Sequence, residues 1–295
     1  TPEIIREYEQ NYPDMILAIF NEVNIKQGTC RNIALDNYVS GEYFCFIDSD
    51  DAVPPYYLEY LYNTARLNNA DVIQLKSSSD TNDIAASPSM LTYDTFICDT
   101  TDKRKDFLLN PAIMTESCLC KFINKNYYDH YHFHFAEGVA YEEPLFTHPI
   151  KHTAKIICRI NEPIYYYRIN PNGTMQQYMQ RYDTICQHML VQLETYNYVK
   201  EHLDIDTFLY EMQLYFVHTF FYETIIFLNA RQMPLTAELV RYMCSITKQI
   251  IPDIMSNPYL GKKGTYEHRE VADYIDSYNH NGNISVLINK LKELK

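Results

Sequence analysis

The side chains of this chain that are best suited to chemistry are carboxylates in short clusters. The first cluster, Asp48, Asp50 and Asp51, comes directly after the apolar run 43–47. Ligands of open α/β sheets bind at the carboxyl ends of strands, where this cluster would lie. Three adjacent carboxylates repel one another, and a divalent cation bridging a pyrophosphate would supply the missing positive charge. Carboxylate oxygens favour Mg²⁺ or Mn²⁺ over softer metals. An acidic turn that caps the next helix is the alternative, and it stays open.

Two further segments carry chemically useful residues. Gly28 precedes a predicted helix, where glycine permits close backbone approach and the helix N-terminus attracts phosphate; Arg31 adds a fork of hydrogen-bond donors. Glu142 and Glu143 are adjacent carboxylates in a mostly apolar setting, which predicts that the pKa of one of them rises. A carboxylate of that kind suits a general base that deprotonates a hydroxyl group. A solvated acidic turn before Pro144 is the alternative for this pair.

Strands and helices that alternate along the first half must position these residues. Apolar runs at 15–20, 43–47 and 71–75 predict buried strands, and Gly28 and Pro54 mark the starts of two helices. This rhythm is typical of a mainly parallel sheet covered by helices. Two more strands, 155–160 and 164–168, are predicted on either side of a turn at Glu162-Pro163.

The pattern changes near residue 180, after which only helical spacing remains. Apolar residues fall on one face of three predicted helices, as in the series Ile185, Met189, Leu193. The sequence therefore predicts an α/β domain over 1–180 and a helical region over 181–295. The aromatic helix 207–230 is expected to be buried either inside the chain or against a second copy of it.

Composition excludes several classes of protein. The net charge of −13 argues against a nucleic-acid partner and against broad docking on anionic lipid, although the tail Lys290, Lys292, Lys295 is locally basic. None of the eight cysteines forms a Cys-x-x-Cys pair, which predicts buried free thiols in a reducing compartment. No signal peptide or membrane-spanning run is present, so we expect a cytoplasmic protein, with peripheral contact at the inner face of the plasma membrane left open.

Histidine pairs are the weaker candidates for a metal site. His132 and His134 alternate along a predicted strand, and His148 and His152 have helical spacing. Neither pair has a third ligand in view, so surface or core roles are favoured.

Several motifs together resemble the family 2 glycosyltransferases of bacterial polysaccharide and teichoic-acid synthesis, which have the GT-A fold. Residues 28–32, Gly-Thr-Cys-Arg-Asn, are similar to the family's G-x-x-R-N segment, and residues 41–51 to its G-E-Y segment ending in D-x-D-D. Lys121 is similar to the Lys of its N-K segment, and residues 141–146 to its Y-E-D-x-x-F. Residues 165–168 with 173–175 are similar to its Y-x-Y-R segment and the [S/T]-apolar pair that follows. Their order and spacing agree over residues 1–180.

The resemblance implies a function and a role for each matching residue. It implies a Rossmann-like GT-A domain that transfers a sugar, with inversion, from a UDP-sugar to a glycan or lipid-linked acceptor of the cell envelope. Glu143 takes the position of the catalytic base, with Glu142 beside it. The implied Mn²⁺ or Mg²⁺ ligands are Asp48 and Asp50, and the implied donor-binding residues are Gly28, Arg31, Asn32, Asp48, Lys121 and Arg168.

The sequence departs from the family pattern in two places. The base of the family is usually Asp, whereas this chain has Glu143, whose extra methylene moves the carboxylate by about one bond length. The family also opens with a strand, a helix and a strand that carries a base-reading Asp, and this chain starts after that unit. We therefore expect a fragment or a degenerate chain, and a non-catalytic binding protein stays the main alternative. A glycoside hydrolase with paired carboxylates is a third hypothesis, and it predicts no affinity for nucleotides.

Overall fold

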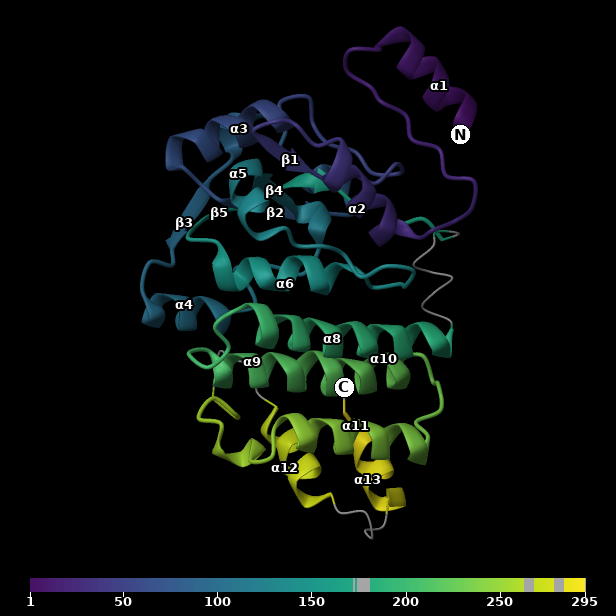
Figure 1. Cartoon of the computed structure of the whole chain (residues 1–295), viewed down its shortest axis with the longest axis vertical. Coiled ribbons are helices and arrows are strands. Elements are labelled where there is room, and N and C mark those ends of the chain that lie inside the picture. The colour runs from purple at the N-terminus through teal and green to yellow at the C-terminus, as the bar shows by residue number, and fades with distance from the viewer. Residues whose placement is uncertain (172, 174–180, 263–267, 279–283, 295) are drawn as a thin grey trace.

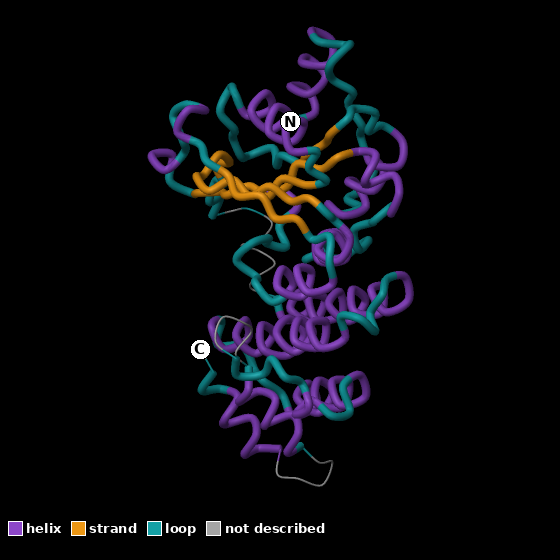
Figure 2. The backbone as a smooth tube through the Cα atoms, turned by 90° about the vertical axis from the view of Figure 1, so that its left-hand side faces the viewer, coloured by secondary structure: helices purple, strands orange, loops and turns teal. Residues whose placement is uncertain are grey.

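A computed structural model describes residues 1–171, 173, 181–262, 268–278 and 284–294. The predicted boundary at residue 180 and the predicted site residues Thr174 and Met175 lie outside this part of the chain. Figure 1 shows a sheet with its helices above layers of helices, and α6 (Glu143–Thr153) lies between the two parts. The turned view in Figure 2 separates the same two parts, with the strands confined to one of them.

The sheet has five strands in the order β1-β4-β2-β5-β3. The β2–β5 pair is parallel, whereas β1–β4, β2–β4 and β3–β5 are antiparallel. The α/β fold class is confirmed, but the prediction of a mainly parallel sheet is wrong, because β4 returns antiparallel between β1 and β2. The region that supplies β3 and β4 has no clear apolar periodicity, so these strands and their directions could not be predicted from it. The strands are β1 (Tyr43–Cys45), β2 (Val72–Ser78), β3 (Tyr93–Ile97), β4 (Lys121–Asn124) and β5 (Ile156–Tyr166).

Two predicted strand features are absent from the described structure. The run 15–20 is not a strand, and Met15 and Leu17 are 84% and 63% exposed, because no neighbouring strand pairs with this run. The helix before it, α1 (Pro2–Asn11), has no buried residue and projects from the body of the molecule in Figure 1.

The predicted turn at Glu162-Pro163 is instead part of β5, and the register opposite Pro163 shifts on both sides of Lys76. This irregularity accommodates a residue that cannot donate a ladder hydrogen bond.

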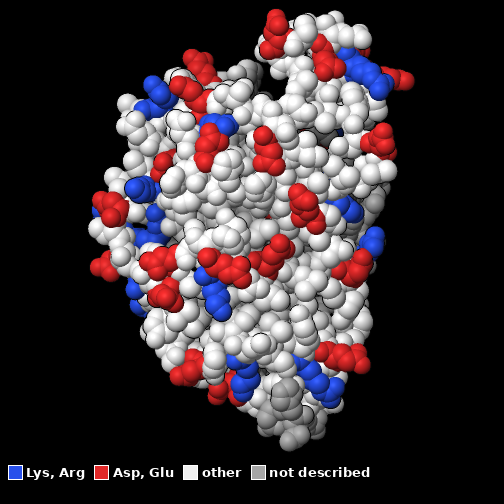
Figure 3. Space-filling view, in the orientation of Figure 1, with Lys and Arg blue, Asp and Glu red and all other residues white. Residues whose placement is uncertain are grey.

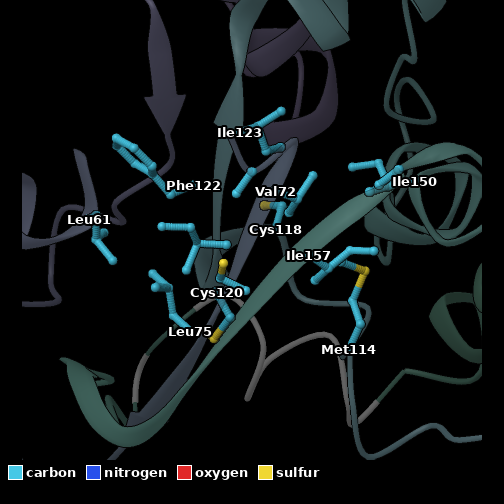
Figure 4. Close-up of a cluster of buried hydrophobic side chains, with 14 of the residues drawn as sticks. Leu61, Val72, Leu75, Met114, Cys118, Cys120, Phe122, Ile123, Ile150 and Ile157 are labelled. Carbon is cyan, nitrogen blue, oxygen red and sulfur yellow. The ribbon is translucent and has the colours of Figure 1, made fainter. Parts of the chain in front are cut away.

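The core of the sheet part lies between the strands and their helices. Val72, Ile123 and Ile157, from three adjacent strands, are completely buried, and Ile150 of α6 covers them (Figure 4). The helices predicted to begin near Gly28 and Pro54 are confirmed. The helices of this part are α2 (Gln27–Asn37), α3 (Tyr57–Asn68), α4 (Thr101–Leu108), α5 (Lys125–Tyr131) and α6, with short 3-10 turns at Thr81–Asp83, Pro88–Met90 and Cys118–Cys120.

The described residues after 180 form helices and no strand, and they have a hydrophobic core of their own. The aromatic segment is buried inside the chain: Phe216, Phe220 and Phe221 are each 0% exposed. Its middle turn is a π-helix, an arrangement frequent at functional sites. The elements are α8 (Tyr182–His202), α9 (Leu209–Phe216), the π-helix η4 (Val217–Glu223), α10 (Thr224–Ala230), α11 (Ala237–Ile250), a 3-10 turn (Ile254–Ser256), α12 (Arg269–Ser277) and α13 (Ile284–Leu291).

The cysteines are free thiols, and the surface carries charges of both signs. All eight cysteines are free, as predicted, although Cys30 is exposed rather than buried. Figure 3 shows Lys and Arg interspersed with Asp and Glu over the face in view. Among the described residues, the structure contains no helix with the length and apolar character needed to span a membrane.

Two leucines of α3 provide a matched test of this packing. Leu61 is 0% exposed and Leu67 is 77% exposed. We expect Leu61→Ala to lower the free energy of unfolding by about 2–5 kcal/mol, since it removes apolar contacts and leaves a cavity. Leu67→Ala should change it by less than about 0.5 kcal/mol. Urea denaturation followed by circular dichroism measures both, and equal losses would contradict the assigned face of α3.

Candidate active site

Arg31 joins the two carboxylate clusters that the sequence singled out. It lies on α2, and its guanidinium donates to Glu142 Oε1 at 2.6 Å and to Asp48 Oδ1 at 3.2 Å. The side chain is only 11% exposed, with Phe46 and Phe135 against the guanidinium. An ion pair shielded from water in this way is stronger than one at the surface. The loop after β1 and the start of α6 are therefore held together by one cation.

The three aspartates after β1 have different environments. Asp51 accepts hydrogen bonds from the Tyr165 hydroxyl at 2.6 Å and from the Arg168 backbone amide at 2.9 Å, so it fixes the loop to the end of β5. Asp50 is exposed. Burial raises the pKa of Asp48, and the charge of Arg31 opposes that rise. Asp48 and Asp50 are thus the members of the cluster with the most freedom to bind a ligand.

Gly28 and Asn32 bring the loop 135–142 against α2. A Cβ atom on Gly28 would come within 2.9 Å of the Glu142 side chain and closer still to the Ala136 carbonyl oxygen. Asn32 is buried, accepts from the Phe135 amide at 2.8 Å and donates to the Phe135 carbonyl at 3.0 Å. Both residues were predicted to bind the donor. In the structure their contacts are with protein, and they position Glu142.

The adjacent glutamates line two different cavities. Glu142 is buried and, with Arg31 and Asp48, lines a cavity of about 290 Å³, called here the strand-end cavity. Glu143 is the first residue of α6 and lines a second cavity, of about 270 Å³, toward the helical region. Its carboxylate accepts from the Cys118 backbone amide at 2.7 Å. The pKa of Glu142 is raised by burial despite the opposing charge of Arg31, which agrees with the expectation for one member of the pair.

Tyr141 forms a wall shared by both cavities. Its φ of 61° lies in the left-handed region, which a bulky residue adopts only when its surroundings impose it. Here the ring stacks on Phe227 at 6.2 Å and meets the edge of His188 at 5.2 Å. Helices after residue 180 therefore position a residue of the candidate site.

Other predicted site residues lie apart from the Arg31 bridge. Lys121 is completely buried, and its ammonium donates to the carbonyls of Thr115 and Ser117 at 2.7 and 2.8 Å. Burial lowers its pKa to about 8. The contact of Lys121 with the donor stays a prediction, and Arg168 is exposed next to Asp51.

The histidine pairs do not form a metal site in the described part of the chain, where no group of three or more metal-binding side chains gathers. His134 pairs with Asp36 at 2.8 Å on the surface, and residues 132–134 are a loop rather than a strand. The rings of His148 and His152 are in contact on α6, where burial lowers the pKa of both.

Three functional candidates were missed in the sequence. Glu116 pairs with Lys151 and accepts from the Thr147 hydroxyl at 2.7 Å; burial favours a higher pKa of Glu116, but Lys151 and His148 together lower it below its usual range. His188 and Glu223 come from α8 and η4. No motif marks these residues, because they approach Glu143 only through tertiary contacts.

Comparison with known proteins identifies the sheet part. Residues 1–131 match the family model described as glycosyl transferase family 2. Residues 1–131 form a family 2 glycosyltransferase domain. The resemblance stated from the motifs is thereby confirmed, and the enzyme class is glycosyltransferase.

Solved structures agree on the fold of this glycosyltransferase. The structure of residues 1–349 of S. aureus TarS in complex with UDP-GlcNAc is 17% identical, with a TM-score of 0.61 over 98% of this chain and 78% of that one. A second structure of S. aureus TarS, also 17% identical, has a TM-score of 0.57 over 93% of this chain and 46% of that one. No curated protein matches the sequence. At this identity the structural likeness supports the GT-A fold together with its helical region.

The ion pair of Arg31 with Glu142 generates a prediction about stability. Arg31→Gln leaves the buried carboxylate of Glu142 without a cation, and we expect a loss of about 3–5 kcal/mol in the free energy of unfolding at pH 7. The double variant Arg31→Gln/Glu142→Gln should recover part of the loss, since the more deeply buried carboxylate is neutralised and only the partly exposed Asp48 still lacks its cation. Urea denaturation of the single and double variants measures the coupling.

The same variant has a predicted pH dependence. Without Arg31 the folded-state pKa of Glu142 rises further above its unfolded value, so the folded protein binds the proton more tightly than the unfolded chain does. The penalty is therefore absent below about pH 4, where the carboxyl is protonated in both states, and it grows as pH rises toward the raised pKa. A loss that is constant from pH 4 to 8 would contradict this origin.

Proposed function

We propose that this chain transfers a sugar from a UDP-sugar to a hydroxyl group of a glycan or lipid-linked acceptor, with inversion at the anomeric carbon. The observation that carries the proposal is the bridge from Arg31 to Asp48 and Glu142, which places the strand-end carboxylates beside Glu143. Envelope polysaccharide is the acceptor class that the family suggests.

The strand-end cavity is the proposed donor site. It is lined by Arg31 and Asp48 and closed on one side by Tyr141, whose ring offers a stacking face. The UDP-GlcNAc bound to S. aureus TarS supports a UDP-sugar as the donor class. A nucleoside diphosphate carries negative charge, and Arg31 and Lys26 are cations that line this cavity.

A divalent cation fits the carboxylates of the loop after β1. Asp48 lines the cavity, Asp50 is exposed in the same loop, and both offer hard carboxylate oxygens, whereas Asp51 is already engaged by Tyr165. Two carboxylates do not complete a coordination sphere, so diphosphate oxygens and water would supply the remaining ligands of Mg²⁺ or Mn²⁺. When bound, the ion would neutralise charge on the leaving diphosphate.

Glu143 is the proposed general base. Its carboxylate takes the proton of the acceptor hydroxyl while the hydroxyl oxygen forms a bond to the anomeric carbon. The bond from that carbon to the diphosphate oxygen breaks on the opposite face, and its electron pair leaves with the diphosphate. The hydrogen bond from the Cys118 amide fixes the direction in which the Glu143 carboxylate points.

Donor binding is the first test. We expect calorimetry to detect UDP binding that strengthens with Mn²⁺, and we expect Asp50→Ala to weaken the metal-dependent binding by at least about tenfold, or 1.4 kcal/mol. Asp206→Ala removes the same charge from an exposed position in the helical region and serves as the matched control. The absence of UDP binding in wild type would support the non-catalytic alternative.

The second test separates chemistry from binding. Glu143→Gln should lower kcat for sugar transfer by about 10²–10⁴-fold, because the amide cannot accept the proton, with UDP affinity unchanged. Release of UDP in the presence of acceptor measures the rate, and calorimetry measures the affinity. A variant that retains the wild-type rate would remove Glu143 from the role of base.

A further inference from the structure

The second cavity, called here the helix-side cavity, lies between the glycosyltransferase domain and the helices that follow it. Its walls come from the loop before β4, the start of α6, and the helices α8, α9 and η4 (Figure 1). Glu143 and Tyr141 line the side toward the glycosyltransferase domain, and His188, Gln192 and Glu223 line the side toward the helices. The volume of about 270 Å³ suits a small polar unit rather than a long chain.

The position of the cavity relates it to the proposed reaction. Tyr141 separates it from the strand-end cavity, and Glu143 opens into it while Glu142 faces the other side. A group that occupies the helix-side cavity therefore meets the carboxylate proposed as the base. That group would be the acceptor, because the donor belongs with Asp48 and Arg31.

The charges that line the cavity disfavour an anion. Glu116, Glu143 and Glu223 are carboxylates, whereas Lys151 is the one cation among the lining residues, and it is paired with Glu116. Glu143 and Glu223 have no lysine or arginine partner in the cavity wall, and Glu223 instead lies 3.2 Å from the Nε2 atom of His218. A phosphate placed there would meet net repulsion in a partly buried site, where charges interact more strongly than in water.

His188 adds a specific hydrogen-bonding requirement. It is 4% exposed, its Nε2 lies 3.2 Å from the Thr219 carbonyl oxygen, and its Nδ1 is buried without a hydrogen-bond partner. A carbonyl oxygen only accepts, so Nε2 carries the proton and Nδ1 of the neutral ring is an acceptor. Burial lowers the pKa of His188, against the raising effect of Glu223, which keeps the ring neutral. An unpaired buried acceptor costs free energy that a ligand hydroxyl group would recover.

The aromatic and amide groups fit the same chemistry. Tyr141 and Tyr215 line the cavity, and the Gln192 side chain accepts from the Tyr215 hydroxyl at 2.8 Å. Carboxylates, a histidine acceptor and aromatic faces together suit the hydroxyl groups and the C–H faces of a sugar ring.

We propose that the helix-side cavity binds an uncharged, hydroxyl-bearing sugar unit of the acceptor and discriminates against phosphate-bearing polyols. This inference rests on the proposed function for the role of the bound unit as acceptor. It assigns acceptor selection to α8 and η4, outside the segment that matches the glycosyltransferase family model.

Direct binding tests the cavity without relying on catalysis. Saturation-transfer NMR on the full chain, with UDP and Mn²⁺ present and absent, would compare the methyl glycosides of glucose, galactose and N-acetylglucosamine with glycerol 3-phosphate and ribitol 5-phosphate. We expect transfer to at least one glycoside and none to the phosphates. His188→Phe and Gln192→Leu should abolish it, and Asn197→Ala, an exposed position on α8, should not. Binding of the phosphates alone, or of no compound, would overturn the proposal, as would glycoside binding unaffected by both variants.

A kinetic measurement separates failure of this inference from failure of the proposed function. With UDP-GlcNAc as donor, Glu223→Gln and Gln192→Leu should raise KM for the best glycoside acceptor by at least about tenfold, the effect of losing about 1.4 kcal/mol of binding. Asn197→Ala, the exposed control on α8, should leave both the acceptor KM and the slow release of UDP without acceptor unchanged. Unchanged acceptor KM with normal UDP release would refute the cavity assignment alone. No UDP binding and no UDP release in wild type would refute the proposed function, while the NMR result would still decide what the cavity binds.

Discussion

The structure around the site depends on one buried cation. Arg31 holds the loop after β1 to the start of α6 through two carboxylates, and it lies 111 residues before Glu142 along the chain. One guanidinium between Asp48 and Glu142 leaves the local charge negative, and the exposed Asp50 adds to that excess. Such a site is stable without a ligand only because the guanidinium fork satisfies both carboxylates at once, which a lysine could not reproduce. The same negative excess is what a divalent cation would neutralise.

The helices after residue 180 belong to the site as much as the sheet does. Tyr141 is held in a left-handed conformation that costs of order 1–3 kcal/mol, and the contacts that hold it there come from His188 and Phe227. A domain boundary near residue 180 therefore describes the order of elements along the chain. It does not separate independent functions, because the wall between the two cavities is built from both parts.

Sequence patterns predicted elements wherever an apolar run had a partner to pack against. The strands at 43–47 and 71–75 and the helices after Gly28 and Pro54 are present, whereas the equally apolar run 15–20 is exposed because strand formation needs a neighbour that periodicity cannot supply. Local motifs named the carboxylates and Arg31 that the fold brings together, but they said nothing of which atoms Gly28 and Asn32 would contact. His188 could not be predicted for the same reason, because it lies near Glu143 through the packing of helices and not through a spacing in the sequence.

The pair Glu142 and Glu143 shows how the chain gives two adjacent, chemically equal groups different roles. The first is the N-cap of α6, and it is buried against Gly28, where Arg31 pairs with it. The second begins the helix, faces the other cavity and is held by the Cys118 amide. Glu143 has a longer side chain than the usual Asp. Its carboxylate accepts the hydrogen bond from the Cys118 amide, so the extra methylene does not leave the carboxylate without a fixed orientation. Movement of the Glu143 carboxylate away from the reacting centre would break this hydrogen bond or move the 117–118 turn. The backbone amide of Cys118 is therefore part of the catalytic geometry proposed for Glu143.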